Sequence, residues 1–308
     1  MRGGTRNHLF FIKFIIFVLL DFDGFLRKCK AHSRTEQVVE ARHSEPERKF
    51  LFIVSIQDVR KPLKAGYPEA THLCTGALIS RRDILTAAHC LENEGRLMFL
   101  EGGTKVKNIE VLVGSSNLRE CTTYYPDSWH TFENWADRKG KSIEFNENDI
   151  AVMKLITAIS DSHVMPATLS KKKYNEIYGF NVFTAGWSKQ ENGQIGSVKK
   201  SSSLIVLDKR KCEAEYKQRT GIERVIEKIY ICTKANPPVL LSEGESGGPV
   251  FDKNAEILGI NSGLSSKDAT NPSEIINVHI SIDAYRAFIA SVRTSSKKSK
   301  CLGLFCTM

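Results

Sequence analysis

Short runs of hydrophobic and β-branched residues, broken by glycine, proline and charged turns, dominate the chain from Phe50 onward. Runs of this length and composition predict the strands of an antiparallel β-barrel or β-sandwich. In the first half of the chain, the pattern predicts strands over residues 52–57, 73–79, 83–88 and 148–155. In the second half, it predicts strands over residues 180–186, 203–207, 229–232, 249–251, 257–263 and 275–280.

Three other stretches depart from the strand pattern. A closing helix is expected near the end of the chain, with Asp283 as its N-cap. Its inner face is predicted by apolar residues at helical spacing, namely Ala284, Phe288, Ile289 and Val292. Residues 115–148 are polar and are expected to form a long loop. The charged run 171–173 marks the expected crossover between the two halves.

The two ends differ in composition from this body. Behind a basic start, an apolar run from Leu9 to Leu20 is interrupted only by Lys13, which suits a signal-peptide core and is short for a membrane span. An uncleaved signal anchor is the alternative. We expect three segments: a signal peptide and propeptide-like segment at 1–37, a folded domain at 38–293, and a basic, cysteine-containing tail at 294–308.

The net charge of +9 is concentrated in those ends. The first 50 residues carry ten Lys/Arg and six Asp/Glu, and residues 293–308 carry four Lys/Arg and no acidic residue. The rest of the chain has 30 basic and 29 acidic groups. A nucleic-acid-binding domain concentrates its basic groups on a folded face. We therefore expect no nucleic-acid partner.

Three motifs contain residues that could act together in nucleophilic catalysis. The run TAAHC supplies the imidazole of His89, NDIAVMKL the carboxylate of Asp149, and GESGGP the hydroxyl of Ser246 in a glycine-rich turn. Each of these residues alone more often has a structural role. Together they occur in the order His, Asp, Ser, which is one of the orders on which a catalytic triad is built.

These motifs resemble the hallmark motifs of the chymotrypsin/trypsin family of serine proteases, with Glu245 where the family usually has Asp. The resemblance implies an all-β fold of two packed antiparallel Greek-key β-barrels with a C-terminal helix. It also implies a secreted, extracellular serine endopeptidase that acts on protein or peptide substrates through an acyl-enzyme. We expect no cofactor and no stable membrane span.

The same resemblance implies a role for each residue of the site. His89 would accept the proton of Ser246, and Asp149 would hold the imidazole. The backbone N–H groups of Gly244 and Ser246 would bind the oxyanion. Ser262 matches a family serine that contacts the buried carboxylate and the substrate backbone.

Eight cysteines behind such a leader favour disulfides. Zinc is the competing explanation, but the chain has no CxxC pair and no HExxH motif, so we expect no metal site. The resemblance implies two bridges, Cys74 with Cys90 and Cys212 with Cys232. It gives no partner for Cys29, Cys121, Cys301 and Cys306.

The activation site departs from the family pattern. Family zymogens are cut so that a new N-terminal ammonium pairs with the acid before the nucleophile, and the corresponding residues here are Val38 and Glu245. The residue before Val38 is Gln37 rather than Arg or Lys. We expect an activating protease as a partner, but a trypsin-like one that cut after Arg34 would leave Thr35 at the new N-terminus, three residues too early.

The expected specificity pocket also departs from the family pattern. Leu240 stands where trypsins have an Asp, and Leu264 and Ile275 stand at wall positions where trypsins have glycines. A buried substrate cation would meet no charge partner there. We expect cleavage after apolar or small side chains. The alternative is a non-catalytic serine protease homologue that acts as a binding or regulatory module.

Overall fold

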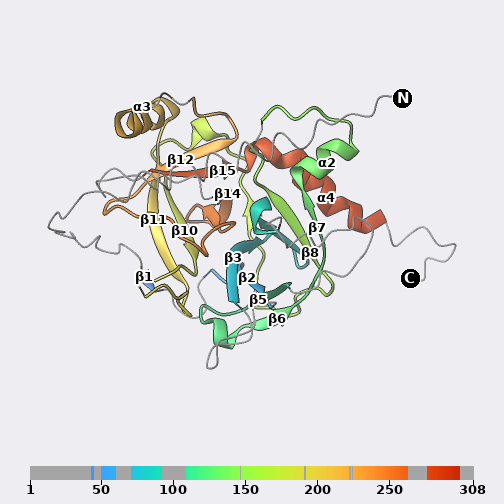
Figure 1. Ribbon diagram of the computed structural model, residues 1–308. Coiled ribbons are helices and arrows are strands. Elements are labelled where there is room, and N and C mark those ends of the chain that lie inside the picture. The colour runs from blue at the N-terminus through green and yellow to red at the C-terminus, as the bar shows by residue number, and fades with distance from the viewer. Residues whose placement is uncertain are drawn as a thin grey trace, which may run out of the picture. The chain divides into compact units, whose positions relative to one another are not determined.

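Antiparallel strands form two barrel-like sheets in the part of the chain that the structure describes (Figure 1). The structure is a computed structural model, and it describes residues 43–44, 50–59, 71–91, 109–145, 147–190, 192–221, 223, 225–262 and 276–298. All of them belong to one compact unit of the chain, Val39–Met308. The all-β class with a C-terminal helix is confirmed.

The first sheet comes from the first half of the chain. Its strands follow one another in the order β6 (Thr122–Tyr124), β5 (Ile109–Val113), β2 (Ile53–Asp58), β3 (Thr71–Leu78), β4 (Asp83–Thr86), β8 (Ala151–Leu155) and β7 (Pro126–Thr131). Every residue of β2, β4 and β8 is buried. The hydrophobic runs predicted for this half therefore form the centre of the sheet.

The second sheet comes mainly from the second half of the chain. Its order is β1 (His43–Ser44), β11 (Lys200–Val206), β10 (Asn181–Gly186), β13 (Pro249–Phe251), β14 (Glu256–Asn261), β15 (Asn277–Ser281) and β12 (Tyr230–Lys234). β11 also pairs with β12, which closes the sheet into a barrel. The short strand β9 (Thr168–Leu169) pairs with β14 in parallel.

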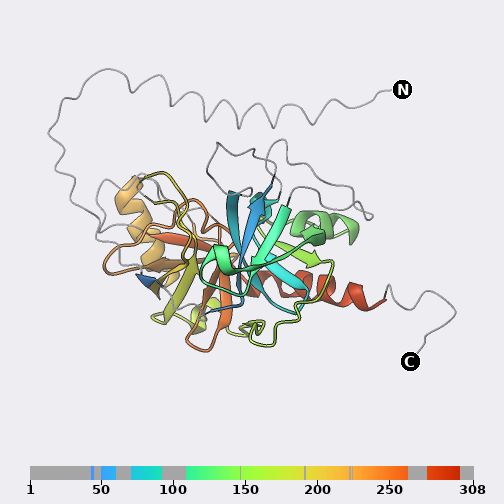
Figure 2. The ribbon, with the colours of Figure 1, turned by 90° about the horizontal axis from the view of Figure 1, so that it is seen from below.

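The two sheets lie side by side (Figures 1 and 2), and β2 contacts β10 while β3 contacts β13. A group of aromatic rings packs at this junction. The ring centroids of Phe52 and Phe251 are 5.2 Å apart, and those of Phe50 and Phe251 are 4.8 Å apart. Phe251 is fully buried. Hydrophobic burial therefore holds together the two sheets that carry the candidate motifs.

Residues 115–148 are not the long loop expected from their polarity. They contain β6, β7 and the helix α2 (Phe132–Arg138). The N-cap of α2 is Thr131, whose hydroxyl accepts a hydrogen bond from the Asn134 N–H. β7 pairs with β8 along most of its length. Tertiary packing therefore orders a segment that the hydrophobic pattern alone did not indicate.

The helix α3 (Lys209–Thr220) was also not predicted. Its sequence is almost entirely polar, so it carries no hydrophobic periodicity. It begins after Asp208, whose side chain accepts a hydrogen bond from Lys211 N, and ends at Gly221 in the left-handed conformation. Cys212, buried within it, forms a disulfide with Cys232 of β12.

The closing helix α4 (Arg286–Lys298) extends five residues beyond the expected domain end at 293. Phe288, Ile289 and Val292 are buried as predicted, whereas Ala284 is exposed. Asp283 is not an N-cap, because it opens the 3-10 turn η5 (Asp283–Tyr285) and bonds the Arg286 side chain instead. None of the helices in the described ranges is long and apolar enough to cross a membrane.

Replacing Phe288 with alanine is expected to lower the free energy of unfolding by about 3–5 kcal/mol, because a fully buried aromatic ring leaves a cavity. The ring packs against Trp135 of α2, with 5.6 Å between centroids. Urea denaturation measures the change. Ala290→Ser, on the exposed side of α4, is the control and should change stability by less than about 0.5 kcal/mol. A loss below 1 kcal/mol for Phe288→Ala would contradict this packing.

Candidate active site

Strand pairing brings His89 and Asp149 together. β4 and β8 are antiparallel neighbours, with Thr86 opposite Ala151. His89 follows the end of β4 in the 3-10 turn η1 (Ala88–Cys90), and Asp149 lies just before the start of β8. Two residues that are 60 positions apart in the sequence therefore meet where the end of β4 lies beside the start of β8.

Asp149 makes two hydrogen bonds to His89. His89 Nδ1 lies 2.8 Å from Asp149 Oδ2, and the backbone N–H of His89 donates to Asp149 Oδ1 at 2.9 Å. A carboxylate only accepts, so Nδ1 carries a proton and Nε2 of the neutral ring is left as an acceptor. The histidine side chain is 45% exposed and the aspartate side chain 19%. The acceptor nitrogen is thus held on a partly open imidazole.

Ser262 reaches the same carboxylate. Its hydroxyl donates to Asp149 Oδ2 at 2.7 Å. Burial raises the pKa of Asp149, but the hydrogen bonds from His89 and Ser262, with the charge interaction with His89, outweigh burial and lower it. Asp149 is therefore ionised at neutral pH, as a group that orients an imidazole must be.

Ser246 lies in a turn that requires glycine on either side. Gly244 has φ of 95° and Gly247 has φ of 76°. A Cβ at Gly244 would lie 2.3 Å from Trp187 O, and one at Gly247 would lie 2.1 Å from the Thr86 hydroxyl oxygen. Both the backbone angle and the close neighbours exclude larger residues. The glycines of the GESGGP run thus allow this turn to pack against the end of β4.

Backbone bonds fix Ser246 next to β3. The N–H of Thr75 donates to Ser246 O at 2.8 Å, and Cys90 Sγ lies 3.8 Å from the same oxygen. Among the described residues, the Ser246 hydroxyl has no hydrogen bond to His89. Catalytic hydrogen bonds are often long before substrate binds. Hydrogen bonds between side chains therefore join His89, Asp149 and Ser262. Ser246 is held near them by the hydrogen bond of its backbone oxygen to Thr75.

The segment around Gly244 is held by a buried histidine. Nε2 of His72 lies 2.9 Å from Gly244 O, and Nδ1 lies 2.7 Å from the Ser55 hydroxyl. The Thr75 hydroxyl also donates to Gly244 O, at 2.8 Å. Burial lowers the pKa of His72 to about 4, so the ring is neutral at pH 7.

The sequence motifs did not assign a specific role to His72 or to His279. Both side chains are buried, and each ring nitrogen of both has a hydrogen-bond partner. A signal was available for His279, which lies between Val278 and Ile280 in the predicted strand 275–280. An imidazole in that position must find partners for both nitrogens.

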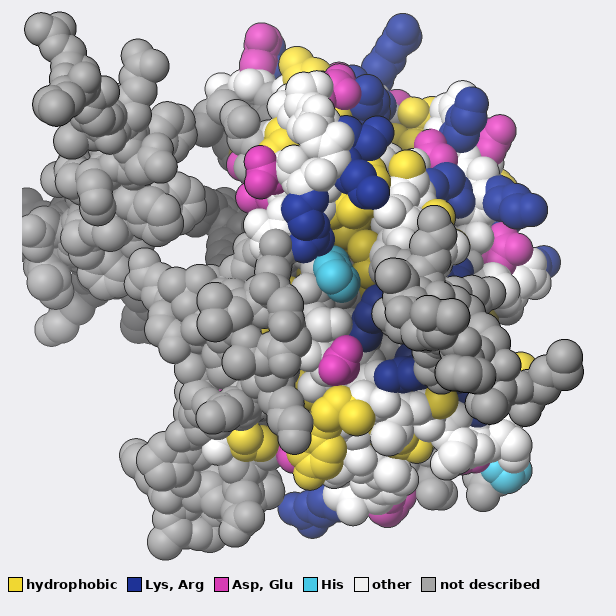
Figure 3. Space-filling view, turned by 90° about the vertical axis from the view of Figure 1, so that its right-hand side faces the viewer, with side chains coloured by type: hydrophobic (Ala, Val, Ile, Leu, Met, Phe, Trp, Pro, Cys, Tyr) yellow, Lys and Arg dark blue, Asp and Glu magenta, His cyan; other side chains and the backbone are white. Residues whose placement is uncertain are grey.

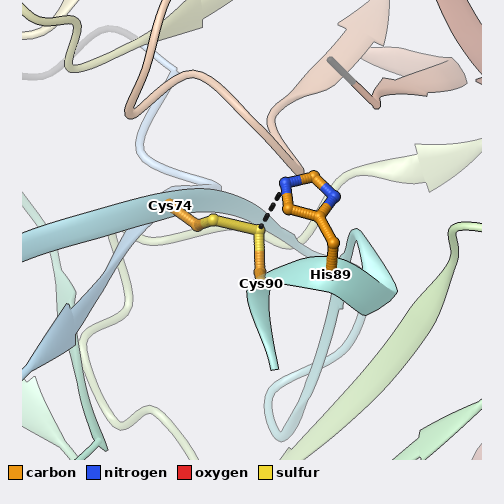
Figure 4. A group of neighbouring side chains, drawn as sticks. All are labelled: Cys74, His89 and Cys90. Atoms are coloured by element: carbon orange, nitrogen blue, oxygen red, sulfur yellow. Dashed lines mark hydrogen bonds between the residues drawn. A yellow bond between two sulfur atoms is a disulfide. The ribbon is translucent and has the colours of Figure 1, made fainter. Parts of the chain in front are cut away.

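Figure 4 shows a disulfide between Cys74 and Cys90, with His89 directed toward its sulfur. The S–S distance is 2.08 Å, and His89 Nε2 lies 3.8 Å from Cys90 Sγ. These three residues are close enough to hold a metal ion. However, both sulfurs are oxidised, and a metal requires thiolates. The group therefore does not fit a metal site in this state.

Glu245 is buried and bonded within its own turn. Its Oε2 accepts hydrogen bonds from the N–H of Ser242 at 2.9 Å and from the Ser242 hydroxyl at 3.3 Å. Val38, the expected activation partner of Glu245, lies outside the described residues.

Leu240 is half-buried in the segment that leads to the Ser246 turn. Asn277 of β15 holds the residues on either side of it. The Asn277 side chain donates to Val239 O at 2.8 Å and accepts from Leu241 N at 3.2 Å. Sequence reasoning missed Asn277. Leu264 and Ile275, the expected pocket walls, lie outside the described residues.

Cys121 is a free thiol, close to the backbone oxygens of Ser115 and Asn117. Cys29, Cys301 and Cys306 lie outside the described residues.

On the face shown in Figure 3, Lys and Arg side chains are interspersed with Asp and Glu. In the coloured part of that view, the positive charge does not form one continuous patch, in keeping with the nearly neutral body of the chain.

Comparison with known proteins identifies the class. The fold is that of a trypsin-like serine protease. By family, the chain is a serine-type endopeptidase. The family model described as Trypsin matches residues 41–289, and the chain belongs to this family. The resemblance that the three motifs indicated is confirmed.

Individual relatives are distant. Granzyme M of Rattus norvegicus is 25% identical over 239 residues, covering 76% of this chain and 81% of that protein. Chymotrypsin-C of Bos taurus is 25% identical over 221 residues, covering 69% and 76%. The solved structure of mouse neuropsin, a serine protease, has a TM-score of 0.60 at 18% identity and covers 82% of this chain and 98% of that chain. The likeness to neuropsin shows the fold alone.

Replacing Ser262 with alanine is expected to raise the pKa of Asp149, because the charged form loses a donor. A lowered carboxyl pKa stabilises the folded state above the unfolded pKa, about 3.9, and the stabilisation is lost as pH falls through the folded pKa. We expect a loss of about 1.5–3 kcal/mol at pH 7 that shrinks on acidification.

Urea denaturation from pH 7 to pH 3 measures this difference. Ser128→Ala is the control, since it removes only an exposed contact of 3.5 Å to Asp127. Equal unfolding free energies of wild type and Ser262→Ala across this range would contradict the assignment.

Proposed function

We propose that the chain hydrolyses peptide bonds of protein substrates through an acyl-enzyme on Ser246. The observation that carries the proposal is the double hydrogen bond between His89 and Asp149, with Nδ1 to Oδ2 at 2.8 Å. It fixes the tautomer in which Nε2 can accept a proton. The Ser246 turn is bonded to β3, next to the strand that leads to His89.

In the first step, His89 Nε2 takes the proton of the Ser246 hydroxyl as Oγ forms a bond to the scissile carbonyl carbon. The carbonyl π electrons move to oxygen, where the N–H groups of Gly244 and Ser246 stabilise the negative charge. When the intermediate collapses, the C–N bond breaks and the leaving amine takes the proton from His89. The product of this step is an ester on Ser246.

In the second step, His89 accepts a proton from water as the water oxygen attacks the ester. Collapse of the second intermediate returns that proton to Ser246 Oγ and releases the acid. Asp149 stays ionised throughout, which its lowered pKa supports. Its role is to hold the ring and to stabilise the imidazolium.

Secretion, which is typical of the family, is part of the proposal, as is cleavage before Val38 by an activating protease. The burial of Glu245 supports a role for its carboxylate inside the fold. Two relatives, from Holotrichia diomphalia and Spodoptera litura, are named phenoloxidase-activating factor 3 and phenoloxidase-activating enzyme 1. Their names support a protein substrate that the chain activates.

A second candidate is a non-catalytic binding or regulatory module. The missing hydrogen bond between the Ser246 hydroxyl and His89, within the described part of the site, favours this candidate. Direct labelling of the nucleophile separates the two.

Processed wild-type protein is expected to react covalently with a fluorophosphonate, and Ser246→Ala is expected to lose this label. Loss of the nucleophile should also lower kcat by on the order of 10⁶-fold. Gel fluorescence and peptide hydrolysis measure the two effects. Ser203→Ala, on the exposed side of β11, is the matched control and should keep the label. Absence of labelling in the processed wild type would favour the non-catalytic module.

Leu240→Asp is expected to shift cleavage toward substrates with Arg or Lys before the scissile bond, because a carboxylate gives the substrate cation a partner. The ratio of kcat/KM for Arg over Leu substrates should rise by about 10-fold or more. Val225→Asp adds the same charge at a side chain that is 71% exposed, and serves as control. An unchanged ratio in Leu240→Asp would mean that this residue does not line the pocket.

A further inference from the structure

A chain of buried polar side chains lies beneath the turn that carries Ser246. Thr233 of β12 bonds His279 of β15, with 2.7 Å between Oγ1 and Nε2. His279 Nδ1 lies 3.0 Å from Asn261 Oδ1, at the end of β14. Asn261 Nδ2 then donates to the carbonyl oxygen of Glu245 at 3.1 Å. Thr233, His279 and Asn261 are each at most 1% exposed.

The partners of each group determine which atom donates and which accepts in these hydrogen bonds. The Glu245 carbonyl only accepts, so the amide nitrogen of Asn261 must face it. The Asn261 oxygen therefore faces His279, whose Nδ1 must carry the proton. Burial lowers the pKa of His279 to about 3, so at neutral pH its Nε2 accepts from the Thr233 hydroxyl. One orientation of the Asn261 amide is compatible with all its partners, and Thr184 Oγ1 accepts its second N–H at 2.9 Å.

Asn261 also holds the other side of Ser246. Its backbone oxygen accepts from Gly247 N at 2.7 Å, and its N–H donates to Gly248 O at 2.8 Å. The carbonyl of Glu245 and the N–H of Ser246 belong to one planar trans peptide unit, so they point in opposite directions. Fixing that carbonyl therefore fixes the direction of the Ser246 N–H.

We propose that Asn261, oriented by His279, is a positioning residue that directs the peptide N–H of Ser246 toward the oxyanion of the reaction. The inference rests on the proposed function, because it assumes that this N–H stabilises the negative charge that develops on the substrate. It assigns to two residues outside the triad a contribution to the transition state.

The other expected donor, the N–H of Gly244, is fixed independently. The carbonyl oxygen of the preceding residue, Glu243, accepts a hydrogen bond from Lys189 N at 3.0 Å. Loss of the Asn261 amide therefore disturbs one oxyanion donor and leaves the other in place. A second bond to Glu245 O, from Gly248 N at 3.0 Å, also remains. The effect should accordingly be smaller than the complete loss of a donor.

Asn261→Val tests the proposal in the full processed chain. We expect kcat for a peptide amide to fall about 10-fold to 100-fold, below the 10²–10³ found for complete loss of an oxyanion donor. KM should change by less than about 3-fold, since the substrate carbonyl in the ground state carries little charge. His279→Phe leaves the amide in place but frees it to rotate, and should lower kcat by about 3-fold to 10-fold.

Asp252→Ala is the matched control for lost buried hydrogen bonds. Its side chain accepts from Asn254 N and Glu256 N in the turn at the opposite end of β13, away from Ser246. This variant should be less stable than the wild type but keep its kcat. If Asn261→Val does not fold, His279→Phe carries the test.

Hydrogen–deuterium exchange of residues 244–248 separates failure of this inference from failure of the proposed function. Exchange of this turn is expected to be at least about 10-fold faster in Asn261→Val than in wild type, whether or not the protein is catalytic. If wild type fails to react with a fluorophosphonate, the proposed function fails, and faster exchange still supports the positioning of the turn. Unchanged exchange with wild-type kcat, or a rise in KM without a fall in kcat, overturns the inference.

Discussion

Thr75 is the residue through which the two sheets hold the candidate nucleophile. It belongs to β3 of the first sheet and is fully buried. Its N–H donates to Ser246 O and its hydroxyl donates to Gly244 O, both at 2.8 Å. Its own carbonyl accepts from the Thr86 hydroxyl at 3.0 Å, at the end of the strand that leads to His89. A shift of either sheet by one residue would break these bonds together, so the register of β3 sets the geometry of the site.

Close packing around this residue explains Gly247 of the motif and Gly186 of β10 better than the flexibility of glycine alone. A Cβ at Gly247 would lie 2.5 Å from Thr75 O, and one at Gly186 would lie 2.8 Å from Thr75 Oγ1. These distances leave no room for a side chain at either position. The Gly-rich run is thus required by a contact between the two sheets. From the sequence alone, it indicates only a turn.

Most of the strands and the order of the candidate triad could be predicted from the sequence, because both follow from local patterns. β13 (Pro249–Phe251) begins and ends where its apolar run does. α2 and α3 could not be predicted in this way. α2 is ordered by contacts such as that of Trp135 with Phe288, and α3 is almost wholly polar and tied down by the Cys212–Cys232 disulfide. The roles of His72 and Asn261 depend on partners 172 and 16 residues away, which no short motif contains.

The pairing of β11 with β12 has a consequence for association between chains. A sheet closed on itself presents few unpaired backbone groups to a second molecule. In the described part of the first sheet, one end of the strand order is β6, which is only three residues long and mostly exposed. So short an edge strand is a poor template for pairing with a strand of another molecule. The architecture that supports the candidate site thus also limits edge-to-edge aggregation.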